Sequence, residues 1–161
     1  MNMKVAVIGS NSFSGSNFIN FLLKMQYEVL AISRSEEYHN VFLAYKWNFK
    51  KPSNLTFCQL DINTDLSEID NKIKLFKPNF IVNFAAQGMV AESWNKPQDW
   101  YQTNVVSQVK LHDKIRQFDF IENYLHFSTP EVYGSTDGWI EESYHFAPNT
   151  PYAASRAACD L

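Results

Sequence analysis

Tyr152 and Arg156 are the residues of this sequence whose types and spacing point most directly to chemistry. They lie four positions apart in a segment predicted to begin a helix, so both side chains would lie on one helix face, one turn apart. A phenol is a poor acid–base catalyst at neutral pH because its unperturbed pKa is about 10, and a nearby fixed positive charge can lower that pKa by roughly 1 to 3. The pair therefore predicts a tyrosine that exchanges protons with a substrate. An ordinary pair on a helix face is the alternative.

The segment from Gly9 to Gly15 has the composition of a phosphate-binding turn. A dinucleotide pyrophosphate requires a tight turn after a strand and the close approach of backbone N–H groups at a helix N-terminus. The two glycines can supply the turn and the close contact between helix and strand. Two glycines alone are equally consistent with an ordinary β–α turn, but the position between the first strand and the first helix favours a dinucleotide site.

Strand-like and helix-like segments alternate along the chain and must position these residues. Short apolar runs predict strands at 4–8, 28–33, 55–60, 80–84 and 124–127. Helical spacing predicts helices after Gly15, at 66–76, at 100–118 and from Tyr152, and the aromatic-rich stretch 36–54 is expected to contain another. Such alternation implies right-handed βαβ crossovers, so the prediction is an α/β fold with a doubly wound parallel sheet, in one domain.

Composition excludes several other classes of protein. Hydrophobic residues make up 45% and charged residues 19% of the 161 residues, as in globular domains. The net charge is −3 and the basic residues are scattered, so nucleic acid is not an expected partner. Cys58 and Cys159 lie far apart without metal-ligand spacing, and no run has transmembrane length. We therefore expect a soluble cytoplasmic domain with reduced thiols, no metal and no membrane partner.

The two motifs resemble those of a known superfamily. The segment from Tyr152 to Arg156 is similar to the Tyr-x-x-x-Lys pair of short-chain dehydrogenases/reductases, with arginine at the lysine position. The turn resembles the Gly-x-x-Gly-x-x-Gly of the extended branch, with Ser12 in place of the middle glycine. This resemblance implies a Rossmann fold that binds NAD or NADP, with the Ser12 hydroxyl able to bond a phosphate oxygen. The cofactor-binding residues that it implies in the turn are Gly9, Ser12, Phe13, Ser14 and Gly15.

Further cofactor contacts follow from the same resemblance. Arg34 ends the second strand, where NAD-preferring members usually carry an acidic residue; a cation suits a 2′-phosphate and favours NADP, and a solvated arginine is the alternative. The Asp-hydrophobic pair after the third strand resembles an adenine contact, although an aspartate there can simply cap a turn. The remaining implied contacts are Asp61, Ile62, Ala85, Ala86, Asn104, Tyr152 and Arg156.

The segment from Ser128 to Gly134 narrows the reaction type. It resembles the Ser-Thr-Asp-Glu-Val-Tyr-Gly of dTDP-glucose 4,6-dehydratases and the Ser-Thr-Ser-Glu-Leu-Tyr-Gly of GDP-mannose 4,6-dehydratases. The resemblance implies that Thr129 holds the sugar O4 hydroxyl near Tyr152 and that Glu131 removes the C5 proton. Pro130 occupies the acid position of the first group. Catalytic roles are thus implied for Thr129, Glu131, Tyr152 and Arg156, and substrate contacts for Gln87, Ser93 and Thr129.

The expected function is a sugar-nucleotide 4,6-dehydratase that forms a 4-keto-6-deoxysugar nucleotide by transient hydride transfer to NAD(P). The alternatives are a sugar-nucleotide 4-epimerase or decarboxylase of the same family, or a non-catalytic nucleotide-binding fragment.

The resemblance extends from Val5 to the last residue. It implies that residues 1–161 form one NAD(P)-binding domain, the N-terminal part of an extended short-chain dehydrogenase, without the C-terminal substrate lobe. We therefore expect this chain alone to be inactive, and the full-length form to be a homodimer.

Overall fold

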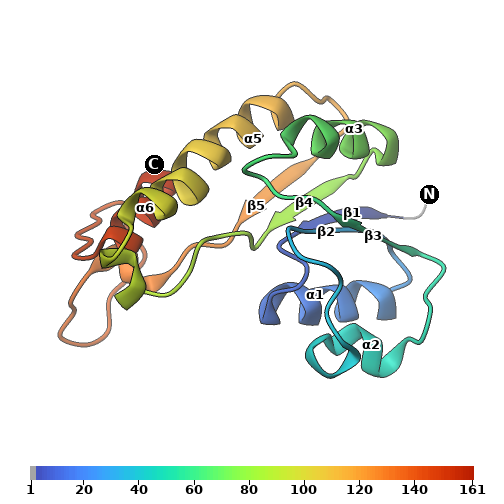
Figure 1. Ribbon diagram of the computed structural model, residues 1–161, viewed down its shortest axis with the longest axis horizontal. Coiled ribbons are helices and arrows are strands. Elements are labelled where there is room, and N and C mark those ends of the chain that lie inside the picture. Colours follow the sequence, from blue (N-terminus) through green and yellow to red (C-terminus); the bar gives the residue numbers. More distant parts are fainter. Residues whose placement is uncertain (1–2) are drawn as a thin grey trace. The chain divides into compact units, whose positions relative to one another are not determined.

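Five parallel strands form one sheet in the computed structural model, which describes residues 3–161 (Figure 1). The strands are β1 (Lys4–Ile8), β2 (Glu28–Ser33), β3 (Leu55–Gln59), β4 (Phe80–Asn83) and β5 (Asn123–His126). Their order is β3-β2-β1-β4-β5, which confirms the predicted doubly wound sheet. The chain leaves β1 towards β2 and β3 and returns on the other side to β4 and β5. The topological switch point, where ligands bind in such sheets, therefore lies between the carboxyl ends of β1 and β4.

Burial along the strands follows their place in the sheet. The inner strands β1, β2 and β4 are almost completely buried, because each is a continuous apolar run covered on both faces. The edge strands β3 and β5 are only partly buried. Residues of β1 pair in register with both neighbours, for example Ile8 with Ile32 and with Asn83.

The sheet belongs to one of two compact units, which comprises residues up to Ala85 together with Asp113–Phe127. Figure 1 shows α1 (Phe13–Lys24) and α2 (Ala44–Asn48) on one face of this sheet and α3 (Leu66–Phe76) on the other. The aromatic-rich stretch folds as the short η1 (Asn40–Phe42) followed by α2. The core of this unit is formed by apolar side chains from β1, β2, β4, α1 and α2 and by the residue that precedes α2: Val5, Val7, Ile19, Leu22, Leu23, Val29, Ala31, Leu43, Tyr45 and Val82.

The second unit comprises Ala86–His112 and Ser128–Leu161. It contains the short helices η2 (Ala91–Trp94) and η4 (Pro130–Tyr133) and the longer α6 (Pro151–Asp160). α6 begins where predicted. The Thr150 side chain caps it by accepting a hydrogen bond from Ala153 N at 3.0 Å, and a proline occupies the first helical position. The division into one domain spanning 1–161 stays a prediction.

The long helix predicted at 100–118 is present, but it runs from 97 to 115 and contains a π-helical turn. The chain forms α4 (Pro97–Tyr101), the π-helical η3 (Gln102–Val106) and α5 (Ser107–Ile115) in succession. Apolar spacing indicates a helix but does not distinguish the i→i+5 bonds of a π-turn from the i→i+4 bonds of an α-helix, and π-turns occur frequently at functional sites. None of the helices in residues 3–161 combines the length and apolar character that crossing a membrane requires.

Candidate functional site

Gly9 and Gly15 are both required by the geometry of the turn after β1. Gly9 has a φ of +81°, and a Cβ there would lie 2.6 Å from Ala85 N, at the carboxyl end of β4. A Cβ on Gly15 would lie 2.4 Å from Gly9 O. Larger residues would therefore push the turn away from the sheet and the helix away from the turn, as the sequence predicts for a phosphate-binding turn.

Ser12 replaces the middle glycine of the motif without backbone strain. Its φ is −68°, which any residue can adopt, and it is the N-cap of α1. Its hydroxyl accepts a hydrogen bond from Gly15 N at 3.0 Å and donates one to Gly9 O at 2.7 Å. The hydroxyl hydrogen is therefore already used within the turn, so the expected bond from Ser12 to a phosphate oxygen does not fit this arrangement.

The start of α1 nevertheless fits a dinucleotide pyrophosphate. The N–H groups of Phe13 and Ser14 have no acceptor within residues 3–161, as expected for the first residues of a helix, and both residues are exposed. The first turn contains no acidic side chain. Ser10 Oγ in the turn is buried without a hydrogen-bond partner within the same residues and could donate to a phosphate oxygen. Asn11 Oδ1 is likewise buried and unpartnered there, but it only accepts hydrogen bonds and so cannot bind a phosphate oxygen. Phosphate oxygens would accept from the free N–H groups and meet the positive end of the helix dipole.

The ends of β2 and β3 carry the residues expected to contact the adenosine. Arg34 directly follows β2 and is exposed, and Gln59 Nε2 donates to its carbonyl at 3.3 Å. Asp61 forms a turn, because its Oδ1 accepts from Asn63 N at 2.8 Å. Ile62 is buried. The turn-forming role considered for Asp61 is therefore present, and the adenine contacts of Asp61 and Ile62 stay predictions.

A buried asparagine fixes the end of β4. Asn83 Oδ1 accepts from Ala85 N at 2.8 Å, and Asn83 Nδ2 donates to Tyr124 Oη of β5 at 2.8 Å. This arrangement holds Ala85 beside Gly9 at the switch point. The sequence predicts a role for the small alanines but not for Asn83, although a polar residue at the end of a buried strand is a signal that could identify it.

In the second unit, Asn104 connects the segment after β4 to α6. Its Oδ1 accepts from Gln87 N at 2.7 Å, while its Nδ2 donates to Gln87 O at 3.0 Å and to Ser155 Oγ at 2.9 Å. Asn104 lies in the π-helical η3 and is buried. These bonds give Asn104 a positioning role that the sequence did not indicate. Its predicted contact with the cofactor, and that of Ala86 nearby, stay predictions.

Ser93 holds the first turn of α6. Its Oγ accepts from Tyr152 N at 3.2 Å and donates to Val90 O at 2.6 Å, and the residue is completely buried. A hydrogen bond from this hydroxyl to a substrate would compete with both bonds. In the structure Ser93 therefore holds α6 in place, and its contact with a substrate stays a prediction. Gln87, the other predicted substrate contact, is half-buried.

Tyr152 and Arg156 lie one turn apart on α6, as predicted. Tyr152 is partly exposed, whereas Arg156 is buried. Burial raises the pKa of the neighbouring Cys159 thiol, and the positive charge of Arg156 opposes this rise. The arginine at the lysine position is therefore packed inside the unit.

Thr129 and Glu131 lie at the start of η4, which contacts α6. The Thr129 hydroxyl caps this short helix, because it accepts from Glu131 N at 3.4 Å. Pro130 occupies the first helical position, where no N–H bond is needed. The Glu131 side chain is partly exposed, and its carboxylate has no hydrogen-bond or ion-pair partner within residues 3–161. The second unit thus combines a helix-capping threonine, an available carboxylate and the helix that carries Tyr152.

Comparison with known proteins identifies the family of the chain. A family model described as GDP-mannose 4,6 dehydratase matches residues 7–161. The chain is similar to a dTDP-glucose 4,6-dehydratase of Xanthomonas campestris pv. campestris (strain B100), with 31% identity over 96% of this chain and 46% of that protein.

Two solved structures have the same fold. One is the dTDP-glucose 4,6-dehydratase DesIV of Streptomyces venezuelae with NAD bound, at 30% identity and a TM-score of 0.82, covering 98% of this chain and 49% of that one. The other is the UDP-Glc/GlcNAc 4-epimerase of Campylobacter jejuni, at 22% identity and a TM-score of 0.85, covering 99% and 47%. The chain spans about half the length of the curated relatives it matches.

Proposed function

This chain belongs to the GDP-mannose 4,6 dehydratase family of extended short-chain dehydrogenases, and on that premise we propose that it is the cofactor-binding part of a sugar-nucleotide 4,6-dehydratase. The observation that carries the proposal is the available carboxylate of Glu131 on η4, next to the helix that bears Tyr152. A 4,6-elimination requires a base for the C5 proton in addition to the tyrosine that acts at O4. The dehydratase names of the relatives support the same reading.

Each residue has a defined task in the proposed reaction. Tyr152 takes the proton of the sugar O4 hydroxyl, which Thr129 holds, and the charge of Arg156 stabilises the phenolate. A bound NAD(P) would supply the hydride acceptor for C4 and the hydride donor for C6. C5 regains a proton, which balances the proton that Tyr152 takes from O4, so the net change is loss of one water. The C4 ketone acidifies the C5 proton, Glu131 removes this proton, and the C6 hydroxyl leaves as water. Pro130 has no proton to give, so Glu131 both takes the C5 proton and protonates the leaving hydroxyl.

We propose NADP as the preferred cofactor. Ser33 and Arg34 stand at the end of β2, where an acidic side chain would bind the ribose hydroxyls of NAD. A guanidinium matches the geometry and the charge of a 2′-phosphate. Solved relatives with NAD bound support a nicotinamide dinucleotide, and the side chain of Arg34 supports the phosphorylated form.

The test of the elimination replaces Glu131 with glutamine in the full-length protein. Glu131→Gln should lower formation of the 4-keto-6-deoxysugar nucleotide about 10²- to 10⁴-fold, the usual contribution of a general base, and abolish exchange of the C5 proton with solvent. Oxidation at C4 should persist. Glu141→Gln, an exposed carboxylate in the same unit, is the control and should leave the rate unchanged. Unchanged elimination in Glu131→Gln would refute the role of Glu131. The 161-residue chain alone should form no product.

Arg156 and Pro130 favour a second candidate, a nucleotide-binding module without turnover. Both depart from the catalytic pattern of the family. Arg156→Lys in the full-length protein separates the two: a large gain in activity marks the arginine as a handicap to a working enzyme, and no activity in either form favours a binding protein. A 4-epimerase or decarboxylase remains the closest alternative among the enzymes, since decarboxylases can carry the glutamate, whereas most epimerases lack it.

We further propose that the full-length form is a homodimer and acts in the cytoplasm on a nucleotide sugar. Exposed apolar side chains at Val106 and Val109, in and next to α5, suit a helix-mediated contact. Light scattering of the full-length protein tests the dimer.

A further inference from the structure

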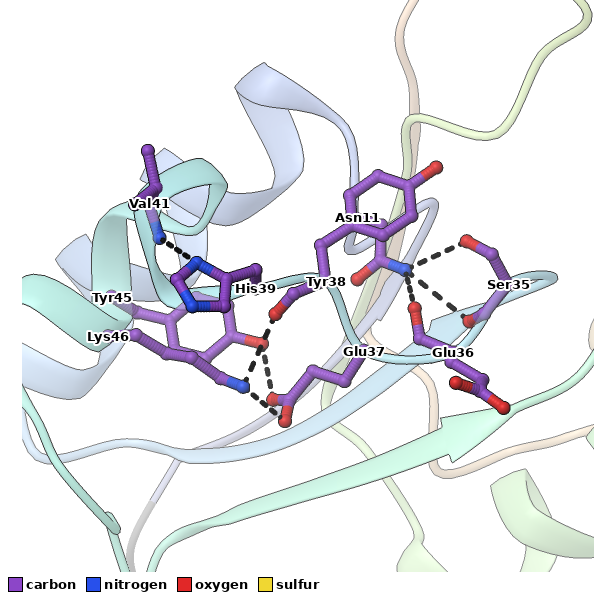
Figure 2. A network of polar contacts seen from close by, with 9 residues as sticks. All are labelled: Asn11, Ser35, Glu36, Glu37, Tyr38, His39, Val41, Tyr45 and Lys46. Carbon is purple, nitrogen blue, oxygen red and sulfur yellow. Dashed lines mark hydrogen bonds and ion pairs between the residues drawn. The ribbon is translucent and has the colours of Figure 1, made fainter.

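Asn11, in the phosphate-binding turn, is bonded to the loop that follows β2. Its Nδ2 lies 2.7 Å from Glu36 O, 3.0 Å from Ser35 Oγ and 3.4 Å from Ser35 O (Figure 2). A side-chain amide has two N–H donors, so the three acceptors share two hydrogens. Asn11 is 8% exposed. One buried side chain thus connects the turn to Ser35 and Glu36, which lie 24 and 25 residues further along the sequence.

The same loop is held from its other side by α2. The Glu37 carboxylate accepts from Tyr45 Oη at 2.6 Å and pairs with Lys46 Nζ at 2.6 Å (Figure 2). Tyr45 is part of the core, and its burial together with the Glu37 carboxylate raises its pKa well above the usual range, so the phenol keeps the proton that it donates. Glu37 is therefore anchored to the core, and Asn11 fixes the two residues that precede it.

The residue between the strand and this anchored loop is Arg34. On its strand side, Ser33 O accepts from Leu60 N at 2.8 Å. On its loop side, Asn11 fixes Ser35 and Glu36. The Arg34 main chain is thus bounded by fixed residues on both sides, although its side chain is exposed. A fixed Cα restricts the volume that the exposed guanidinium can reach, which lowers the entropy lost when it binds a phosphate.

We propose that Asn11 is a positioning residue for cofactor selection: through Ser35 and Glu36 it holds the Arg34 main chain where the guanidinium meets the 2′-phosphate of NADP. This inference rests on the proposed binding of NADP. It means that the turn facing the pyrophosphate also sets the loop facing the 2′-phosphate. A merely structural role for Asn11 predicts equal loss of affinity for every adenine nucleotide, whereas a positioning role predicts loss of selectivity for the 2′-phosphate.

The test measures dissociation constants of the purified chain for NADP and NAD, and for the smaller probes 2′,5′-ADP and 5′-AMP, which differ by the 2′-phosphate. Asn11→Ala should weaken NADP and 2′,5′-ADP about tenfold, the loss expected for one to two hydrogen bonds, and change NAD and 5′-AMP less than about twofold. Asn54→Ala is the matched control, because Asn54 Nδ2 also donates to a backbone carbonyl, Tyr27 O, at 2.7 Å, but next to the opposite end of β2. It should leave the ratio of NADP to NAD affinity unchanged.

A second measurement does not depend on any cofactor. Backbone amides of residues 35–37 should exchange with deuterium faster in Asn11→Ala than in the unsubstituted chain or in Asn54→Ala. If Asn11→Ala does not fold, Ser35→Ala probes the same bond from the loop side, and it should lower the ratio of NADP to NAD affinity about two- to threefold. If Asn11→Ala weakens the binding of all four nucleotides equally, the inference about Asn11 is overturned, whereas the proposal that the wild-type chain prefers NADP is not affected. A wild-type chain that binds NAD as tightly as NADP overturns the proposed cofactor preference, and the inference with it.

Discussion

Removing the Asn104 side chain should strongly destabilise the unit that carries Tyr152. Asn104→Ala deletes three hydrogen bonds at once, two to the backbone of Gln87 and one to Ser155 Oγ. A typical net contribution is about 0.5–1.5 kcal/mol for each bond, and a buried polar group left unpaired costs about 1–3 kcal/mol. Ser155 Oγ also donates to Tyr152 O at 2.7 Å and so keeps one partner, and Gln87 is only half-buried. The expected loss in free energy of unfolding is therefore about 2–4 kcal/mol, below the sum of the upper bounds.

Urea unfolding followed by tryptophan fluorescence measures this loss, because Trp100 is buried in the same unit and donates to Gly88 O at 2.8 Å. Far-ultraviolet circular dichroism should be recorded in parallel, since two units can unfold separately. Asn48→Ala removes a comparable amide bond, to Asn20 Oδ1 at 3.0 Å, from an exposed position and should cost less than about 0.5 kcal/mol. A loss below about 1 kcal/mol in Asn104→Ala would refute the claim that these bonds hold η3 to α6.

Three other changes test the turn and the response of the fold to pH. Gly9→Ala should lower the free energy of unfolding by more than about 2 kcal/mol in a denaturation assay, because the φ of Gly9 is +81° and the new Cβ would overlap a backbone nitrogen. Gly138→Ala is the control: Gly138 also has a positive φ, but its Cβ would meet no atom within 4 Å. The loss in Gly138→Ala therefore measures the cost of the backbone conformation alone. Ser12→Ala should cost about 1 kcal/mol as a lost helix cap, and Ser12→Gly only a few tenths. Burial lowers the pKa of His112 in the folded chain. As the pH falls below about 6.5, the imidazole is therefore protonated first in the unfolded chain, and stability should decrease until the pH falls below the pKa of His112 in the folded chain. His112→Asn should flatten this part of a plot of the urea midpoint against pH.

The sequence predicts the sheet well because its strands are short apolar runs with clear breaks. The bounds of β2 and α3 coincide with the predicted ranges 28–33 and 66–76. α3 ends at Lys77, which adopts a φ of +52°, and Pro78 then prevents continuation of the helix. Local chemistry of this kind can be read along the chain. The π-helical turn of η3 cannot be predicted in this way, because Asn104 in that turn bonds Ser155, 51 residues further along the chain.

The site is predictable in its residue types but not in its bonding. The resemblance implies that Ser93 and Asn104 contact the ligands, and in the structure both side chains hold α6, across 59 and 51 residues of sequence. The sequence does not indicate a role for Asn11, because nothing adjacent to it points to the loop that it reaches. A motif specifies which side chains gather near a ligand, whereas the partner of each side chain depends on tertiary contacts that no local pattern contains.

The departures from the family pattern have unequal physical consequences. Ser12 adopts an ordinary φ and caps α1, and Pro130 occupies a position where a missing N–H costs nothing, so both fit the fold without strain. Arg156 is different, because it places a bulky and permanently charged group in a buried position 3% exposed, on the helix that Ser93 and Asn104 both hold. Anchoring at both the first turn and Ser155 limits how far α6 can shift to accommodate that group. Arg156 is therefore the departure that the packing of α6 must accommodate, whereas Ser12 and Pro130 fit positions that the backbone offers to any residue or to proline.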